Sequence, residues 1–117
     1  MLTEKMLEIV VAILDEGKAN HIHVIDVHEK TSITDYFIIA SGTSERHVKS
    51  LSEQVVEKLK ALQIKPLGVE GEQGSEWVLV DLGDVVLHVM LPLTREFYQL
   101  EKLWEPDFVP KRNSAVW

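Results

Sequence analysis

Apolar residues recur along this chain with two spacings, one typical of helices and the other of strands. Steps of three and four residues in segments 2–17 and 43–62 place the apolar side chains on one stripe, which predicts two amphipathic helices. Thr3 and Gly17 are suited to cap the two ends of the first helix, and Thr43 or Ser44 is suited to cap the second.

β-Branched and aromatic residues are concentrated in short segments that predict strands. These segments are HIHVIDVH (21–28), DYFIIA (35–40), 67–69, 76–81 and 84–91. DYFIIA is apolar on both faces and is therefore expected at the centre of a sheet. The last two segments predict a hairpin around Leu82-Gly83.

A final helix is predicted over 95–104, with Thr94 as its cap and Phe97, Leu100 and Leu103 as its buried stripe. The order of helices and strands predicts an α/β fold, in which helices flank a mixed β-sheet of about five strands. A chain of 117 residues is sufficient for one domain with one core. We expect that domain to span 1–104, and 105–117 to form a tail with two prolines.

Composition and charge limit the function. The formal net charge of −7 argues against a protein that follows nucleic-acid phosphates through a basic face. The chain has no Cys, which excludes thiolate catalysis and Cys-ligated zinc. The first residues do not resemble a signal peptide, and no apolar run approaches the ~20 residues of a membrane span. We therefore expect a cytoplasmic protein.

The strongest local signal is a charge asymmetry. Between Leu67 and Thr94 the chain has no Lys or Arg, whereas it has five acids and a tryptophan, which are Glu70, Glu72, Glu76, Asp81, Asp84 and Trp77. An acidic surface steers a basic partner by complementary potential, and a tryptophan can anchor it. The simpler interpretation is a solvated sheet edge whose acids maintain solubility.

Two other patterns suggest chemistry. Glu70 and Glu72 would share one face of an extended segment and hold a divalent cation, with the turn 41–44 as the phosphate-binding loop of a metal-dependent enzyme. His21 and His23 on one strand face would be two of the ligands of a zinc site. The simpler interpretations are helix capping and surface histidines. His88 is expected to be half-buried with one hydrogen bond, and Trp104 to pack against the core.

Three separated segments together resemble a known family. SITDYFIIASGTSERHVKSLSEQVVEKL, GVEGEQGSEWVLVDLGDVVLHVM and REFYQLEKLW are closely similar to the Iojap family, the ribosomal silencing factors of bacteria and organelles. The resemblance spans about residues 26–104, and the predicted first helix also agrees with it. The N-terminus does not resemble a transit peptide, which favours a bacterial member.

The resemblance implies a nucleotidyltransferase-like fold without catalysis or cofactor. It also implies binding to the large ribosomal subunit through that subunit's fourteenth protein, near the intersubunit face, so that the small subunit is prevented from joining and translation is repressed. Sequence-specific nucleic-acid binding and membrane binding are not expected.

From charge and predicted exposure, we expect eight residues to contact the basic ribosomal protein: Asp35, Tyr36, Glu70, Glu72, Trp77, Asp81, Asp84 and Tyr98. A nucleotidyltransferase-like enzyme is the alternative function. A third interpretation is a scaffold that dimerises through a sheet edge or the last helix, and a free homodimer is compatible with all three.

Overall fold

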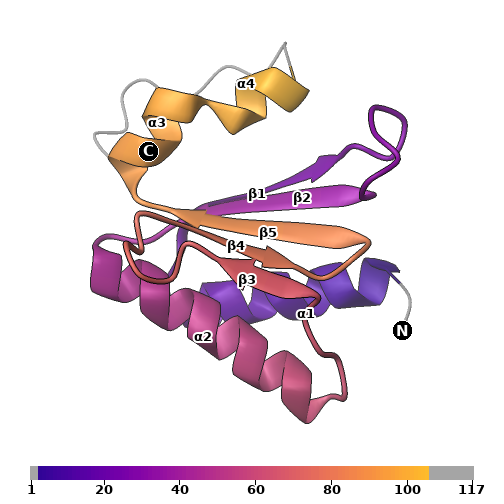
Figure 1. The fold of residues 1–117 in the computed structure, drawn as a ribbon, viewed down its shortest axis with the longest axis horizontal. Helices are drawn as coiled ribbons and strands as arrows, with labels where there is room; N and C mark the ends of the chain where they lie inside the picture. Colours follow the sequence, from indigo (N-terminus) through magenta and orange to yellow (C-terminus); the bar gives the residue numbers. More distant parts are fainter. Residues whose placement is uncertain (1–2, 106–117) are drawn as a thin grey trace.

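The structure is a computed structural model that describes residues 3–105 (Figure 1). Along the chain it contains α1 (Thr3–Glu16), β1 (Asn20–Asp26), β2 (Tyr36–Ser41), α2 (Glu45–Ala61), β3 (Gly68–Glu70), β4 (Trp77–Asp81), β5 (Val85–Met90), α3 (Pro92–Tyr98) and α4 (Leu100–Trp104). The two long helices and all the strands were predicted, with ends that differ by one to a few residues.

The strands form one sheet in the order β1-β2-β5-β4-β3. β2 and β5 are parallel, and the other neighbouring pairs are antiparallel, so the prediction of a mixed sheet is confirmed. β2 lies between β1 and β5, so it is an interior strand as its two apolar faces indicated, although the central strand of the sheet is β5. β4 and β5 form the expected hairpin, whose turn contains Gly83 at φ +89°.

Helices α1 and α2 form one layer that packs against one face of the sheet, below the sheet in Figure 1. Alternate strand residues such as Ile38, Val80 and Leu87 point into this core and are fully buried. Leu14 of α1 and Leu51 of α2 are buried against them. Burial of such side chains contributes roughly 1.5–3 kcal/mol each, and this core is therefore the main source of stability.

Capping agrees with the sequence at α2 but not fully at α1. The Ser44 hydroxyl accepts a hydrogen bond of 3.1 Å from the backbone N–H of His47, as expected of an N-cap. Thr3 lies within the first turn of α1, and its hydroxyl donates instead to Asp84 at 3.1 Å. After Gly17 it is Lys18 that takes the left-handed conformation, with φ 64°.

The last predicted helix is wrong in its bounds, its cap and two of the three residues of its buried stripe, whereas Leu100 packs against the sheet as predicted. α3 begins at Pro92, which suits a first helical turn because its missing N–H is not needed there, and no side chain caps it. Gln99 then takes a left-handed conformation (φ 48°) that separates α3 from α4. This break changes which side chains face the sheet, so Phe97 is 79% and Leu103 68% exposed.

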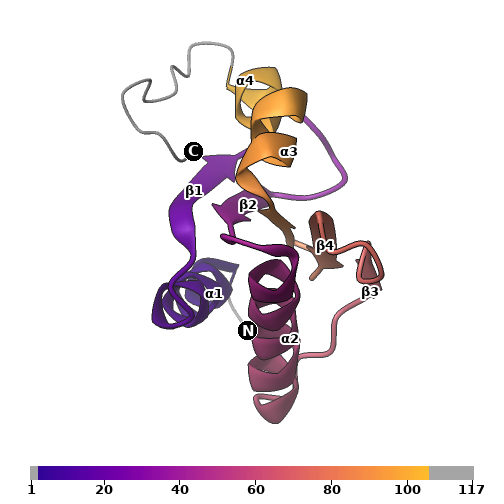
Figure 2. The same ribbon diagram turned by 90° about the vertical axis from the view of Figure 1, so that its left-hand side faces the viewer.

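α3 and α4 cover only part of the second face of the sheet. Figure 2 shows them above the β1–β2 side, while β3 and β4 extend beyond them. Beneath these helices a smaller core contains Ile25, Val27, Ile39 and Met90, with Trp104 packed against it as predicted. The face of β4 and β3 is therefore left without a helical layer.

Candidate functional site

The uncovered part of the sheet presents alternate residues of β4. Val78 and Val80 are buried towards α1 and α2, whereas Trp77, Leu79 and Asp81 are partly exposed on the opposite face. Glu70 of β3 lies directly opposite Leu79 and therefore shares this face. We call Glu70, Trp77, Leu79, Asp81 and the adjoining Tyr98 the open sheet face.

Trp77 and Tyr98 meet although they belong to different elements. Their ring centroids lie 4.9 Å apart with an interplanar angle of 51°. Tyr98 ends α3 and is 53% exposed, so it forms the rim between this helix and the open sheet face. The structure thus brings together two of the three aromatic residues of the predicted contact set, and Tyr36 is the one that lies elsewhere.

The Trp77–Tyr98 pair is one end of a longer series of rings, which we call the aromatic row. Neighbouring centroids lie between 4.9 and 5.9 Å apart in the order Trp104, Phe37, His88, Trp77, Tyr98 and Phe97. The row runs from the helix-covered core to the exposed side of α3. Offset or edge-to-face contacts of this kind each add about 0.5–1.5 kcal/mol beyond area burial.

His88 is the polar member of the aromatic row. Its ring Nδ1 accepts a 2.9 Å hydrogen bond from the Trp77 indole Nε1–H, which requires a neutral ring with its proton on Nε2. The side chain is only 6% exposed, which is deeper than the half-buried position predicted, although the single hydrogen bond was expected. Burial lowers the pKa of His88 to about 4.

The two glutamates of the predicted metal pair do not share a face. β3 ends at Glu70, and Gly71 turns the chain with φ +88°. Glu72 then lines a groove beside Glu57 and Lys60 of α2, on the other side of the sheet. The expectation of a two-carboxylate face was therefore wrong, because it assumed an extended segment through Gly71.

Three further members of the predicted contact set lie away from Trp77. The backbone N–H groups of Asp35 and Tyr36 both donate to the carbonyl oxygen of Asp84 at 3.0 Å. The Tyr36 side chain packs against the core under α1, and Asp84 accepts from Thr3. These residues gather beside the start of α1. Because Glu72 lies apart in the groove beside α2, the structure divides the predicted set among three places.

Backbone N–H groups of the turn proposed as a phosphate-binding loop, and of the helix that follows it, are already engaged. The backbone N–H of Thr43 donates to Nδ1 of His47 at 2.9 Å, and the N–H of His47 donates to Ser44. His21 has φ 49° at a bulge of β1, so it does not form a regular strand face with His23. Within residues 3–105 no group of three His, Cys, Asp or Glu side chains is placed to hold a metal ion.

A buried ion pair fixes α3 and α4 on the sheet. Arg95 Nε donates to Glu101 Oε1, and Arg95 Nη1 donates to the Ser41 hydroxyl at 2.9 Å, with both charged side chains 1% exposed. Burial lowers the pKa of Arg95, while the nearby Glu101 carboxylate opposes that change. Sequence reasoning missed this pair, because charged residues in a helix are usually assigned to its exposed side.

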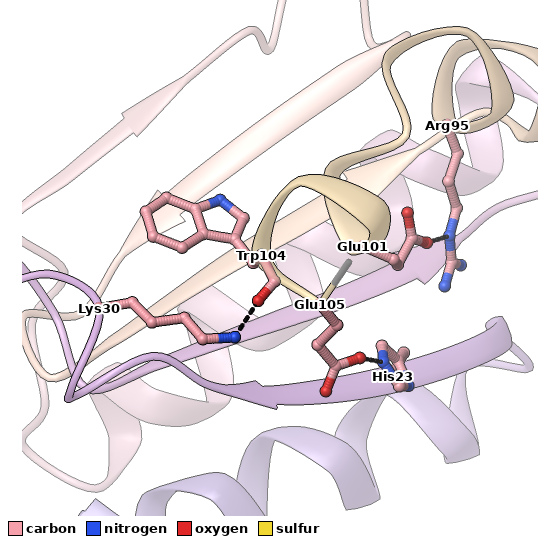
Figure 3. Close-up of polar contacts among 6 residues, drawn as sticks. All are labelled: His23, Lys30, Arg95, Glu101, Trp104 and Glu105. Atoms are coloured by element: carbon pink, nitrogen blue, oxygen red, sulfur yellow. Dashed lines mark hydrogen bonds and ion pairs between the residues drawn. The ribbon is translucent and has the colours of Figure 1, made fainter. Parts of the chain in front are cut away.

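The end of α4 is held by two more contacts (Figure 3). Lys30 Nζ donates to the carbonyl oxygen of Trp104, and the His23 ring lies 2.7 Å from Glu105 Oε1. Both contacts join the end of α4 to β1 and the loop that follows it. The predicted tail lies outside the described residues apart from Glu105 itself.

Comparison with known proteins gives a consistent result. The family model "Ribosomal silencing factor during starvation" matches residues 2–115. A "Ribosomal silencing factor RsfS" of Chromobacterium violaceum is 40% identical over 92% of this chain and 91% of its own length. That of Haemophilus influenzae is 39% identical over 85% and 97%. The mouse "Mitochondrial assembly of ribosomal large subunit protein 1" is 41% identical over 84% of this chain and 44% of its own length.

Solved structures agree with the fold. A crystal structure of a Chromobacterium violaceum protein, 37% identical, superimposes with a TM-score of 0.91 and covers 99% of this chain and 96% of that protein. One from Bacillus halodurans, 32% identical, gives a TM-score of 0.80 over 87% and 95%. Within the part of this chain that the structure describes, no helix has the length and apolar character needed to cross a membrane.

Proposed function

Because this chain belongs to the ribosomal silencing factor family, we propose that it binds the large ribosomal subunit and prevents the small subunit from joining. The proposed partner is the fourteenth protein of the large subunit, a basic protein near the intersubunit face. Silencing then occurs by occlusion, without a bond being made or broken.

The observation that supports this proposal is the composition of the open sheet face. The Trp77–Tyr98 pair, whose rings are in tilted contact, offers aromatic surface for apolar or cationic side chains of a partner. Glu70 and Asp81 lie on the same face, within a stretch that has no Lys or Arg from Leu67 to Thr94. A basic protein complements this charge, and the missing helical layer leaves the face accessible.

The dimensions of the domain support occlusion as the mechanism. Its shortest extent is 23 Å. Where two ribosomal subunits are in contact, the space between their surfaces is no larger than about a water molecule. A domain of this thickness bound at the contact surface would therefore keep the subunits apart. When the open sheet face is docked, α1 and α2 lie on the far side of the sheet from the partner. Those helices then occupy the volume that the small subunit needs.

The proposed function is tested by titrating subunit joining, measured by light scattering, with purified protein and no nucleotide. Inhibition is expected to be stoichiometric with bound protein, because a wedge does not turn over. Inhibition that requires nucleotide, or that is complete far below one protein per large subunit, would favour the enzymatic alternative and contradict occlusion.

Replacing Trp77 with Ala is expected to weaken large-subunit binding by ~2 kcal/mol or more, about 30-fold, because it removes the aromatic anchor. Co-sedimentation measures the affinity, and circular dichroism checks that the fold is retained. Ile33→Ala is the matched control, since Ile33 is 84% exposed in the β1–β2 loop, away from the open sheet face. Equal affinities for the two variants would remove Trp77 from the interface.

Reversing the charge of Glu70 is expected to slow association with large subunits by roughly threefold to tenfold at low salt, with a smaller effect at high salt. Glu72→Lys is the control, because it makes the same change two residues away but on the α2 side of the sheet. Biosensor kinetics at two ionic strengths measure both variants. Slower association of Glu72→Lys than of Glu70→Lys would place the docking surface on the helical side.

A further inference from the structure

His88 occupies a position where an apolar residue would be expected. All six residues of β5 are buried, and the other five are Val, Leu or Met. A polar group buried there is disfavoured unless it is hydrogen-bonded. The hydrogen bond that His88 makes to a side chain goes to Trp77, and its ring also packs edge-on against Phe37 at 5.1 Å.

We propose that His88 is a positioning residue for docking, which holds the Trp77 indole in the orientation that contacts Tyr98 and faces the partner. The inference rests on the proposed function of the open sheet face. It goes beyond that function because the orientation of the Trp77 anchor is set by His88, a buried residue that the partner does not need to contact.

The physical reason lies in the freedom of the indole. Trp77 is only partly buried, and its Tyr98 neighbour is itself half exposed at the end of a short helix. The indole packs against the smaller core and against Tyr98, and such apolar contacts are not directional. The hydrogen bond from its Nε1–H to His88 is directional and therefore selects one rotation of the ring. A side chain that is ordered before binding loses less conformational entropy on binding, which increases affinity.

The direct test observes the Trp77 indole N–H by ¹H–¹⁵N NMR in the free protein. The chain contains Trp77, Trp104 and Trp117, so Trp77→Phe identifies the resonance. His88→Leu removes the acceptor and is expected to shift this resonance upfield and to speed its exchange with water. His88→Asn supplies an oxygen near the place of Nδ1 and is expected to restore both properties, although it loses the same ring packing as Leu.

Binding to large subunits provides the second readout. His88→Leu is expected to lower the affinity by about fivefold to tenfold, as for the loss of one hydrogen bond, and His88→Asn to recover most of it. In a Trp77→Phe background, which lacks the indole donor, His88→Leu should have no further effect. Melting curves ensure that each variant is compared well below its unfolding temperature.

An unchanged indole resonance in His88→Leu would overturn the proposal. It would also be overturned if the resonance shifted while the affinity stayed the same, or if the affinity loss persisted in the Trp77→Phe background. If the wild-type protein does not bind large subunits, the proposed function fails. The NMR comparison would then still decide whether His88 orients Trp77.

Discussion

Replacing Glu101 with Ala is expected to destabilise the fold by about 3–5 kcal/mol, because it leaves the buried Arg95 guanidinium without its carboxylate. Both side chains are 1% exposed, so water cannot replace the lost partner without the structure opening. Urea unfolding followed by circular dichroism measures the change in the free energy of unfolding. The loss is expected to begin at α3 and α4, which this pair joins to Ser41 of β2.

The double variant Arg95→Met with Glu101→Leu is the control for that result. It removes both charges together and fills a similar volume, and such replacements are often neutral or stabilising. Glu101 Oε2 has no hydrogen-bond partner among residues 3–105, so the wild-type pair is not fully satisfied. If the double variant is as unstable as Glu101→Ala, the prediction is contradicted. The ion pair itself would then stabilise the fold, since the double variant keeps a similar buried volume and leaves no unpaired charge.

The second large effect is a loss of stability in mild acid. The pKa of His88 is about 4 in the folded protein and 6.5 in an unfolded chain, so the folded state favours the neutral ring. The free energy of unfolding is therefore at its full value, as far as His88 is concerned, above pH 6.5. It decreases as the pH falls from 6.5 towards 4, because the unfolded chain then binds a proton at His88 and the folded protein does not. Below pH 4 both states are protonated, and the effect of His88 does not change further. Its size is about 3 kcal/mol, from 1.36 kcal/mol per pKa unit.

The measurement compares the unfolding free energies of wild type and His88→Asn between pH 4 and pH 7. Wild type should lose its stability relative to this variant as the pH falls, because the variant has no ring to protonate. Other groups that titrate contribute equally to both proteins, so their effects cancel in the comparison. One such group is the exposed His28, whose pKa is raised by its hydrogen bond to Asp26. His28 therefore stabilises the folded state at low pH, and this stabilisation is lost as the pH rises. Parallel curves would mean that His88 does not titrate on unfolding.

Local patterns were sufficient to predict most of the fold. The helical spacing of apolar residues identified α2, and the continuous apolar run of β2 placed it in the interior of the sheet. Both signals arise from residues that are close in sequence and share one environment. The acidic stretch also identified the strand that contains Trp77, because the absence of cations can be observed without any structure.

The sequence was not sufficient where a distant contact or a single backbone angle determines the structure. The left-handed Gln99 divides the last helix, and nothing in its side chain distinguishes it from an ordinary helical residue. Gly71 places Glu72 on the opposite side from Glu70, although strand alternation predicted one face. The Trp77–His88 bond depends on the register of β4 and β5, which no short motif specifies.

The parallel pairing of β2 with β5 also has a consequence for the order of folding. The antiparallel pairs join strands that follow one another along the chain, which are β1 with β2, β3 with β4, and β4 with β5. The parallel pair joins strands that are distant in sequence, since Tyr36 of β2 lies opposite Val85 of β5. Pairs that are distant in sequence form slowly, because a long loop must close before the contacts stabilise it. During synthesis β2 therefore has an open edge until β5 leaves the ribosome, and the sheet is completed only when the two halves join.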